Sequence, residues 1–135
     1  MKKLLFIKLG ALGDVFQAAA AMAYYRDHEP EMRVDWVIGD QLAPLLESMK
    51  ITDQIHPVDE RRLFSGRLLK RVIYLISLAW KLRARFDRVI IGYQDKRYGL
   101  LASFIVRRET RYFEPYGDRP SPIHHRNRVY EYLRL

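Results

Sequence analysis

The segment Gly10-Ala11-Leu12-Gly13-Asp14 contains the residue types of this sequence that are best suited to ligand binding and proton transfer. It follows a short apolar run and precedes an alanine-rich stretch, which predicts a turn between a buried strand and a helix. Glycine lets a ligand approach the backbone closely, and the N–H groups at a helix start attract anions. The Asp14 carboxylate could accept a proton from a substrate hydroxyl. This turn is therefore the first candidate site.

A structural role for Asp14 competes with this chemical role. Asp14 and Gln17 have the spacing of a capping box, and Asp is among the preferred residues at a helix N-cap. The glycine spacing also differs from the dinucleotide-binding fingerprint, which needs a third Gly, and from a phosphate loop, which needs Gly-Lys-Ser/Thr. The residue types alone therefore favour a helix cap over a general base at Asp14.

Positive charge is concentrated in the middle of the chain. Residues 61–88 contain nine Lys and Arg residues and one acid, Asp87, so this segment carries as much charge as the whole chain, whose net charge is +8. Arg61, Arg62 and Arg67 follow the third predicted strand, and we expect them to contact a negatively charged substrate. Long charged side chains usually stay at the surface, so we expect an ordinary solvated face for Lys81, Arg83, Arg85 and Arg88.

The elements that must position these residues alternate along the chain. Short apolar runs predict strands over Lys3–Leu9, Arg33–Ile38, Gln54–Val58, Arg88–Tyr93 and Arg111–Glu114. Between and after them, the pattern predicts helices from Asp14 to Tyr25, Asp40 to Met49, Leu63 to Arg85, Tyr98 to Arg107 and His124 to Leu135. This alternation predicts an α/β domain over residues 1–135, with an open parallel sheet of Rossmann-like type and helices on both faces.

Ligands bind at the carboxyl edge of such sheets. Lys96 and Arg97 follow the fourth predicted strand at this edge, so they are further expected substrate contacts, and Arg111 is a weaker one. His124 and His125 are adjacent on a predicted helix, where neighbouring residues do not face one side, so we expect no metal site there.

The composition excludes several classes of protein. The chain has 135 residues, of which 49% are hydrophobic, and it contains 17 aromatic residues, which excludes wholesale disorder and fits one compact domain. It contains no cysteine, which excludes disulfides, iron–sulfur clusters and a thiol nucleophile. Lys8 and Asp14 interrupt the apolar start before it reaches the length of a secretory signal, so we expect a cytoplasmic protein.

The apolar run from Val72 to Trp80 is too short to cross a membrane. It holds nine residues, whereas a spanning helix needs about 20. We expect this run to form a buried core helix. The basic residues on both sides of it leave binding at a membrane interface as the alternative.

Several segments resemble the lipopolysaccharide heptosyltransferases, glycosyltransferase family 9. The specific match is the opening Lys3-Leu4-Leu5-Phe6-Ile7-Lys8-Leu9-Gly10-Ala11-Leu12-Gly13-Asp14-Val15. Residues 34–39 look like the family's second strand, and residues 86–94 look like its strand with a leading Asp. His125-Arg126 with Tyr132-Leu133 resembles a later His-bearing helix, so the resemblance extends over essentially the whole chain.

The resemblance implies a fold and an activity. It implies the N-terminal, acceptor-side half of a two-domain GT-B glycosyltransferase, whose second domain binds the ADP-sugar. Such enzymes transfer a heptose from ADP-heptose to the inner core of lipopolysaccharide, with inversion and without a required metal or other cofactor. Asp14 matches the family's proposed general base, with Gly10, Ala11 and Gly13 as substrate contacts around it. The acceptor glycolipid, a nucleotide sugar and the anionic inner face of the bacterial inner membrane are the implied partners.

The sequence departs from the family pattern in three places. Many relatives have Ser at the position of Gly10 or Ala11 and Pro at the position of Ala20. The third departure is larger, because nothing in these 135 residues corresponds to the donor-binding domain, and the chain stops inside a predicted helix without a stop signal. We therefore expect an incomplete domain that is inactive without a C-terminal domain. A genuine C-terminal helix, which needs no stop signal, remains as the alternative.

Two other classes of function remain as alternatives. A non-catalytic module could retain the fold and the basic face to bind a phosphorylated glycolipid. A nucleic-acid-binding domain would also use the +8 charge, since neutralisation of phosphates drives such binding, but the sequence contains no recognisable reading motif. We therefore favour the glycolipid over nucleic acid as the partner.

Overall fold

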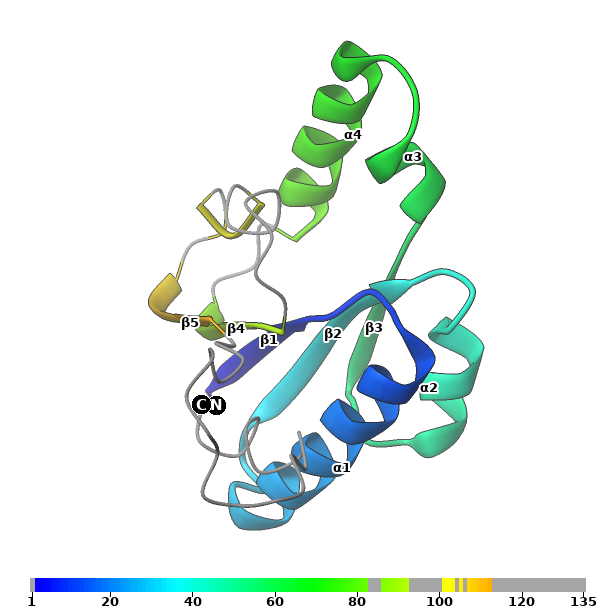
Figure 1. Cartoon of the computed structure of the whole chain (residues 1–135). Coiled ribbons are helices and arrows are strands. Elements are labelled where there is room, and N and C mark those ends of the chain that lie inside the picture. Colours follow the sequence, from blue (N-terminus) through cyan, green and yellow to red (C-terminus); the bar gives the residue numbers. More distant parts are fainter. Residues whose placement is uncertain (1, 83–85, 93–100, 104, 106, 113–135) are drawn as a thin grey trace, which may run out of the picture.

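The computed structural model describes residues 2–82, 86–92, 101–103, 105 and 107–112 (Figure 1). Five parallel strands form one sheet in the order β3-β2-β1-β4-β5. The strands are β1 (Lys3–Ile7), β2 (Arg33–Gly39), β3 (Gln54–Val58), β4 (Phe86–Ile91) and β5 (Arg107–Tyr112). The helices of at least five residues are α1 (Leu12–His28), α2 (Ala43–Met49), α3 (Glu60–Phe64) and α4 (Leu68–Lys81). The predicted fold class, a Rossmann-like parallel sheet between helices, is confirmed.

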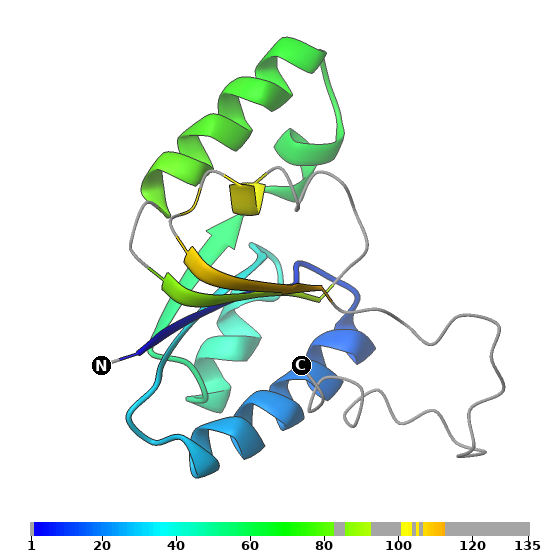
Figure 2. The same ribbon diagram turned by 90° about the vertical axis from the view of Figure 1, so that its left-hand side faces the viewer.

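Helices cover both faces of the sheet (Figure 2). On one face, α1 and α2 pack on side chains of alternate strand positions, including Leu4, Phe6 and Trp36, in one buried cluster. On the other face, α4 packs on the intervening positions, including Leu5 and Val37, in a second buried cluster. The alanine-rich inner side of α1, with Ala18 and Ala21 fully buried, lets this helix lie close to the sheet.

The predicted long helix from Leu63 to Arg85 is wrong, because it is two helices. α3 ends at Phe64 and α4 begins at Leu68, with Ser65, Gly66 and Arg67 between them. Gly66 has a φ of +94°, a backbone conformation that L side chains rarely adopt, so the chain turns here instead of continuing. The segment from Asp59 to Arg62 caps and begins α3: Asp59 is the N-cap, and its Oδ1 accepts a hydrogen bond from the Arg62 N–H.

The fifth strand also differs from the prediction. β5 begins at Arg107 instead of Arg111, so the preceding helix cannot extend to Arg107 as predicted. The strand sequence is polar and lies at the edge of the sheet, where no alternating apolar pattern marks it. Of the predicted helix 98–107, only residues 101–103, which are helical, and 105 lie within the described part before β5, and the predicted helix 124–135 lies outside the described residues.

The expectation that Val72 to Trp80 is a buried core helix is correct for only part of α4. Leu75, Leu78 and Ala79 are buried against the sheet. Six other large apolar side chains of this helix are exposed: Leu68, Leu69, Val72, Ile73, Ile76 and Trp80. The helix therefore has two apolar sides, and the sheet covers only one of them.

Candidate functional site

The turn after β1 leads directly into α1 at the carboxyl edge of the sheet. Ala11 is the N-cap of α1, and its side chain makes no capping hydrogen bond. Asp14 lies in the first turn of the helix, so the predicted cap at Asp14 is wrong. A Cβ atom at Gly13 would have nothing within 4 Å, so the space beside this turn is open. Asp14 therefore lies at the carboxyl edge of the sheet, inside the first turn of α1, and is not the N-cap of this helix.

Asp14 forms an ion pair with Lys8. Lys8 Nζ lies 3.2 Å from Asp14 Oδ2, and the Lys8 side chain is 2% exposed whereas that of Asp14 is 24% exposed. The indole N–H of Trp36 donates a hydrogen bond to the Lys8 carbonyl oxygen, at 3.0 Å, and so fixes the backbone beneath the pair. A buried ammonium requires a counter-charge, and Asp14 supplies one. The pair holds the Asp14 carboxylate in a defined position at the edge of the site.

Gly92, directly after β4, provides the room for the Lys8 side chain. A Cβ atom at Gly92 would lie 3.1 Å from Lys8 Cδ and 3.2 Å from Phe6 Cζ, closer than ordinary contacts. The sequence analysis missed Lys8 as a site residue. A lysine at the end of an otherwise apolar strand, six residues before an aspartate, is the signal that could have found it.

Glu60 is a second carboxylate at this edge that the sequence analysis missed. It is the first residue of α3, and its Oε1 would lie 3.7 Å from a Cβ atom at Gly10. At Gly39 the same oxygen would lie 2.0 Å from a Cβ atom, so the carboxylate fills the space that a side chain would need there. The absence of a side chain at Gly39 therefore lets α3 begin beside the turn that contains Gly10.

The predicted substrate contacts Arg61 and Arg62 directly follow Glu60 in α3. They line a groove of about 650 Å³ between α3 and α4, together with Lys70 and Tyr74. The Tyr74 hydroxyl accepts a hydrogen bond from the Asp59 N–H, at 2.9 Å, which ties the start of α3 to α4. Arg62 Nε also forms an exposed ion pair with Asp59, at 3.2 Å. The structure thus brings three cationic residues, Arg61, Arg62 and Lys70, to one concave surface between α3 and α4.

The other predicted cations have different placements. Arg67 is the N-cap of α4 and is not among the residues that line the groove. Arg88 is half-buried and donates a hydrogen bond to the Tyr25 hydroxyl, so the prediction of a solvated Arg88 is wrong, whereas Lys81 is exposed as predicted. The remaining predicted cations and histidines lie outside the residues whose side chains are described: Arg83, Arg85, Lys96, Arg97, Arg111, His124 and His125.

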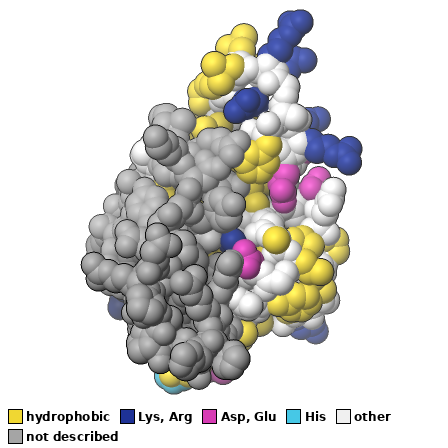
Figure 3. All heavy atoms as spheres, in the orientation of Figure 1, with side chains coloured by type: hydrophobic (Ala, Val, Ile, Leu, Met, Phe, Trp, Pro, Cys, Tyr) yellow, Lys and Arg dark blue, Asp and Glu magenta, His cyan; other side chains and the backbone are white. Residues whose placement is uncertain are grey.

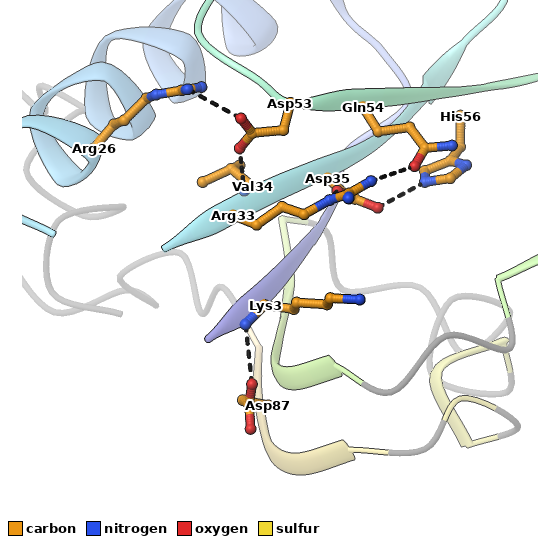
Figure 4. Close-up of polar contacts among 9 residues, drawn as sticks. All are labelled: Lys3, Arg26, Arg33, Val34, Asp35, Asp53, Gln54, His56 and Asp87. Carbon is orange, nitrogen blue, oxygen red and sulfur yellow. Dashed lines mark hydrogen bonds and ion pairs between the residues drawn. The ribbon is translucent and has the colours of Figure 1, made fainter. Parts of the chain in front are cut away.

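A separate polar cluster lies at the amino ends of the strands, away from this edge (Figure 4). Asp35 Oδ1 accepts a hydrogen bond from Arg33 Nε at 2.9 Å, and its Oδ2 lies 3.2 Å from His56 Nε2. Burial raises the pKa of Asp35, but the hydrogen bonds from His56 and Arg33 outweigh it and hold this pKa below its usual value. Every charged group in the cluster has a partner, which fits a structural role.

Among the described residues, no group of three or more His, Asp or Glu side chains could hold a metal ion. No helix in the described part of the chain is long and apolar enough to cross a membrane.

Comparisons with solved structures identify proteins that share this fold. No protein-family model matches the sequence, and no curated protein matches it significantly. Among solved structures, a family 9 glycosyl transferase from Veillonella parvula matches 98% of this chain with a TM-score of 0.76 and 20% identity. The heptosyltransferase WaaC of E. coli with ADP matches 98% of the chain with a TM-score of 0.74 and 17% identity. The chain shares its fold with these glycosyltransferases.

WaaC is also matched in its structure with ADP-2-deoxy-2-fluoro heptose, with a TM-score of 0.60 over 97% of this chain. The chain spans 40% of the length of the Veillonella glycosyl transferase and 46% of the length of WaaC. It therefore corresponds to under half of each of these proteins. The similarity predicted from the opening motif is confirmed at the level of the fold.

Proposed function

We propose that this chain is the acceptor-side domain of an inverting heptosyltransferase-like enzyme that transfers a heptose from ADP-heptose to the inner core of lipopolysaccharide. The observation that carries the proposal is the Asp14 carboxylate, held by Lys8 at the carboxyl edge of a sheet with a glycosyltransferase fold. Gly10, Ala11 and Gly13 belong to the same turn, and the open space at Gly13, where a Cβ atom would have nothing within 4 Å, supports a sugar bound beside it.

In the proposed reaction, Asp14 acts as the general base. Its carboxylate accepts the proton of an acceptor hydroxyl while the hydroxyl oxygen forms a bond to the anomeric carbon of the heptose. The bond from that carbon to the ADP oxygen breaks on the opposite side, and ADP leaves with the electron pair. The configuration at the anomeric carbon is thereby inverted. Positioned proton transfer of this kind contributes about 10²–10⁴-fold to a rate.

The cationic residues beside the site would bind the acceptor. Two of these residues, Arg61 and Arg62, line the groove. The sequence adds three further expected contacts, which are Arg67, Lys96 and Arg97. Their cationic groups suit the phosphate and carboxylate groups of a lipid-linked core. We place this acceptor at the cytoplasmic face of the bacterial inner membrane.

The donor would be bound largely outside these 135 residues. The WaaC structures contain ADP and a fluorinated ADP-heptose, and this chain spans under half of WaaC. We therefore propose that the chain alone does not turn over ADP-heptose and needs a donor-binding domain, in the same polypeptide or in a partner. No metal or other cofactor enters the proposed reaction.

An intact-mass measurement first establishes the size of the native protein, which is detected through its residues 34–50. The test is then the variant Asp14→Asn of that native protein, assayed for heptose transfer. We expect kcat to fall at least about 10²-fold while acceptor binding is retained. Asp40→Asn is the matched control, because Asp40 is an exposed carboxylate that follows β2 at the same edge of the sheet. Near-normal turnover by Asp14→Asn would remove Asp14 from the role of base.

A binding module without catalysis is the second candidate function. The ion pair with a buried lysine favours it, because Asp14 could serve only to neutralise Lys8. In that case the chain binds the acceptor glycolipid through the groove, and no transfer occurs even when a donor-binding domain is supplied. The alternative also has a nucleic-acid form. This form would be excluded if the chain bound nucleic acid no more tightly than heparin at moderate salt.

A further inference from the structure

The Glu60 carboxylate lies against the turn after β1, although the two residues that follow it in α3 line the cationic groove. Its Oε1 and Oε2 atoms would lie 3.7 Å and 4.0 Å from a Cβ atom at Gly10. Its Oε1 atom also fills the space beside Gly39, where a Cβ atom would lie 2.0 Å from it. The two segments are joined, because the Gly39 N–H donates a hydrogen bond to the Leu9 carbonyl oxygen, at 3.0 Å. The carboxylate of Glu60 therefore lies where the chain leaves β1 and β2.

Among the described residues, no polar contact accounts for this placement. The Glu60 carboxylate forms no hydrogen bond or ion pair within that part of the chain, and the side chain is half-buried. The neighbouring Asp59 caps α3 through the Arg62 N–H and forms the ion pair with the Arg62 side chain. A carboxylate that is partly removed from water without a partner costs free energy, and hydrogen-bond donors of a ligand can offset this cost. The oxygens of Glu60 are therefore suited to a ligand.

The two sides of α3 differ in charge. Arg61 and Arg62 line the groove with Lys70, whereas Glu60 is not among the residues that line it. In Figure 3, acidic side chains lie directly below the basic side chains over α3 and α4, on the side of the sheet. An ionised carboxylate repels anions and only accepts hydrogen bonds. A ligand that spans both sides would therefore carry its negative charge at the groove and neutral hydrogen-bond donors at the turn.

We propose that Glu60 binds hydroxyl groups of the acceptor sugar and so determines which way the acceptor lies. The hydroxyl-bearing part of the ring lies at the turn with Gly10, and the anionic groups of the acceptor lie in the groove. The two oxygens of one carboxylate can accept hydrogen bonds from two hydroxyls, and such charge-assisted bonds are stronger than neutral ones. The inference rests on the proposed function, in which Asp14 remains the base, and it adds a residue that selects the acceptor.

The experiment compares heptose transfer by the native protein and by its Glu60→Gln variant, with the deacylated, phosphorylated inner-core oligosaccharide of lipopolysaccharide as the acceptor. Gln has the shape of Glu and still fills the space beside Gly39, but it carries no charge and has one acceptor oxygen fewer. We expect KM for the acceptor to rise about tenfold or more, while kcat changes by less than about threefold. Calorimetry without a donor should show the same loss of affinity for the oligosaccharide.

Two further variants separate the position of the carboxylate from its presence. Glu47→Gln is the matched control, because Glu47 is an exposed carboxylate of α2, and it should bind and turn over as the parent does. Gly39→Ala should displace the Glu60 carboxylate without changing its charge, since the added Cβ atom would meet Oε1. It should also raise KM, and adding Glu60→Gln to it should raise KM little further, because both substitutions remove the same contact.

Analogues of the oligosaccharide test the hydroxyls directly. In a series in which each lacks one hydroxyl of the acceptor sugar, at least one analogue should bind the parent about tenfold more weakly than the complete oligosaccharide does. Glu60→Gln should discriminate less between these two ligands, because part of the interaction is already lost.

Four outcomes would overturn the inference. Unchanged KM and affinity in Glu60→Gln, with transfer intact, would overturn it and leave the proposed function standing. A fall in kcat alone, as expected for Asp14→Asn, would assign Glu60 to proton transfer. A loss of affinity that follows an equal loss of stability in urea would assign it to packing beside Gly39. A parent that neither binds nor glycosylates the oligosaccharide would overturn the proposed function and this inference together.

Discussion

The two faces of the sheet are built differently, although the same strands supply both. On the face of α1 and α2, the buried cluster includes Phe6 and Trp36, whose rings meet edge to face with centroids 4.5 Å apart. On the face of α3 and α4, the helix α4 buries three residues against the sheet and leaves six large apolar residues exposed. We call the first face the completed face, because the side chains of its cluster are buried. On the second face, the apolar residues of α4 extend from the buried cluster to the exposed surface.

This difference separates stability from binding within one small domain. The completed face holds Lys8 in place through the hydrogen bond from Trp36 to the Lys8 carbonyl, and Lys8 in turn holds Asp14. The other face supplies the cationic groove and the exposed apolar residues of α4. Substitutions on the completed face should therefore affect the free energy of unfolding, whereas substitutions of these exposed residues should change it little.

The two tryptophans test this comparison most strongly, because one lies on each face. Trp36 is fully buried, so Trp36→Ala should lower the free energy of unfolding by about 3–5 kcal/mol. Trp80 is 70% exposed, so Trp80→Ala should lower it by about 0.5 kcal/mol or less. Urea unfolding of both variants measures the contrast. If Trp36→Ala does not fold, Trp36→Phe takes its place with a smaller loss. Equal losses at the two positions would mean that α4 is packed on its outer side too.

The pair Lys8 and Asp14 gives the next largest effect and separates structure from chemistry. Asp14→Ala leaves a buried ammonium without its carboxylate and should cost about 1–3 kcal/mol, less than for a fully buried pair because Asp14 is partly exposed. Lys8→Met should cost less, because water can reach the remaining carboxylate. The double variant should be about as stable as Lys8→Met, as measured by urea unfolding.

Turnover should not follow this pattern of rescue. If Asp14 is the base, the double variant regains stability over Asp14→Ala but remains as inactive. Recovery of turnover together with stability would show that Asp14 acts only through the packing of Lys8.

Much of the fold could be predicted because local patterns determine it. The apolar runs place β1, β2 and β3 to within two residues, and β3 has the predicted bounds Gln54–Val58. The alternation of strands and helices predicts the parallel sheet, since parallel strands need crossover connections. The edge strand β5 was placed four residues too late, because an edge position requires no apolar pattern.

The site could be predicted only in part, because its contacts join distant segments. Asp14 has the spacing of a cap, and only the folded chain shows that Lys8 is its partner instead. Glu60 reaches Gly39 across the sheet edge, a contact between segments that sequence spacing does not connect. Periodicity likewise shows that α4 is apolar over a wide arc but not which side the sheet covers. The Ser65-Gly66 break interrupts the helix without interrupting its apolar spacing.

The smallest expected effect concerns Asp35, which lies on the sheet face that α4 covers, at the amino ends of the strands. Arg33 and His56 surround its carboxylate there. The pKa of Asp35 is lowered in the folded chain, so below about pH 4, the ordinary value for Asp, the unfolded chain binds more protons than the folded one. The stability that this carboxylate contributes is therefore present above about pH 4 and is lost as the pH falls through its lowered pKa. Asp35→Asn should be less stable than the parent at neutral pH, and urea midpoints should show the difference shrinking in acid. A difference that stays constant down to the acid limit of folding would mean that Asp35 stabilises this end of the face through packing and not through its charge.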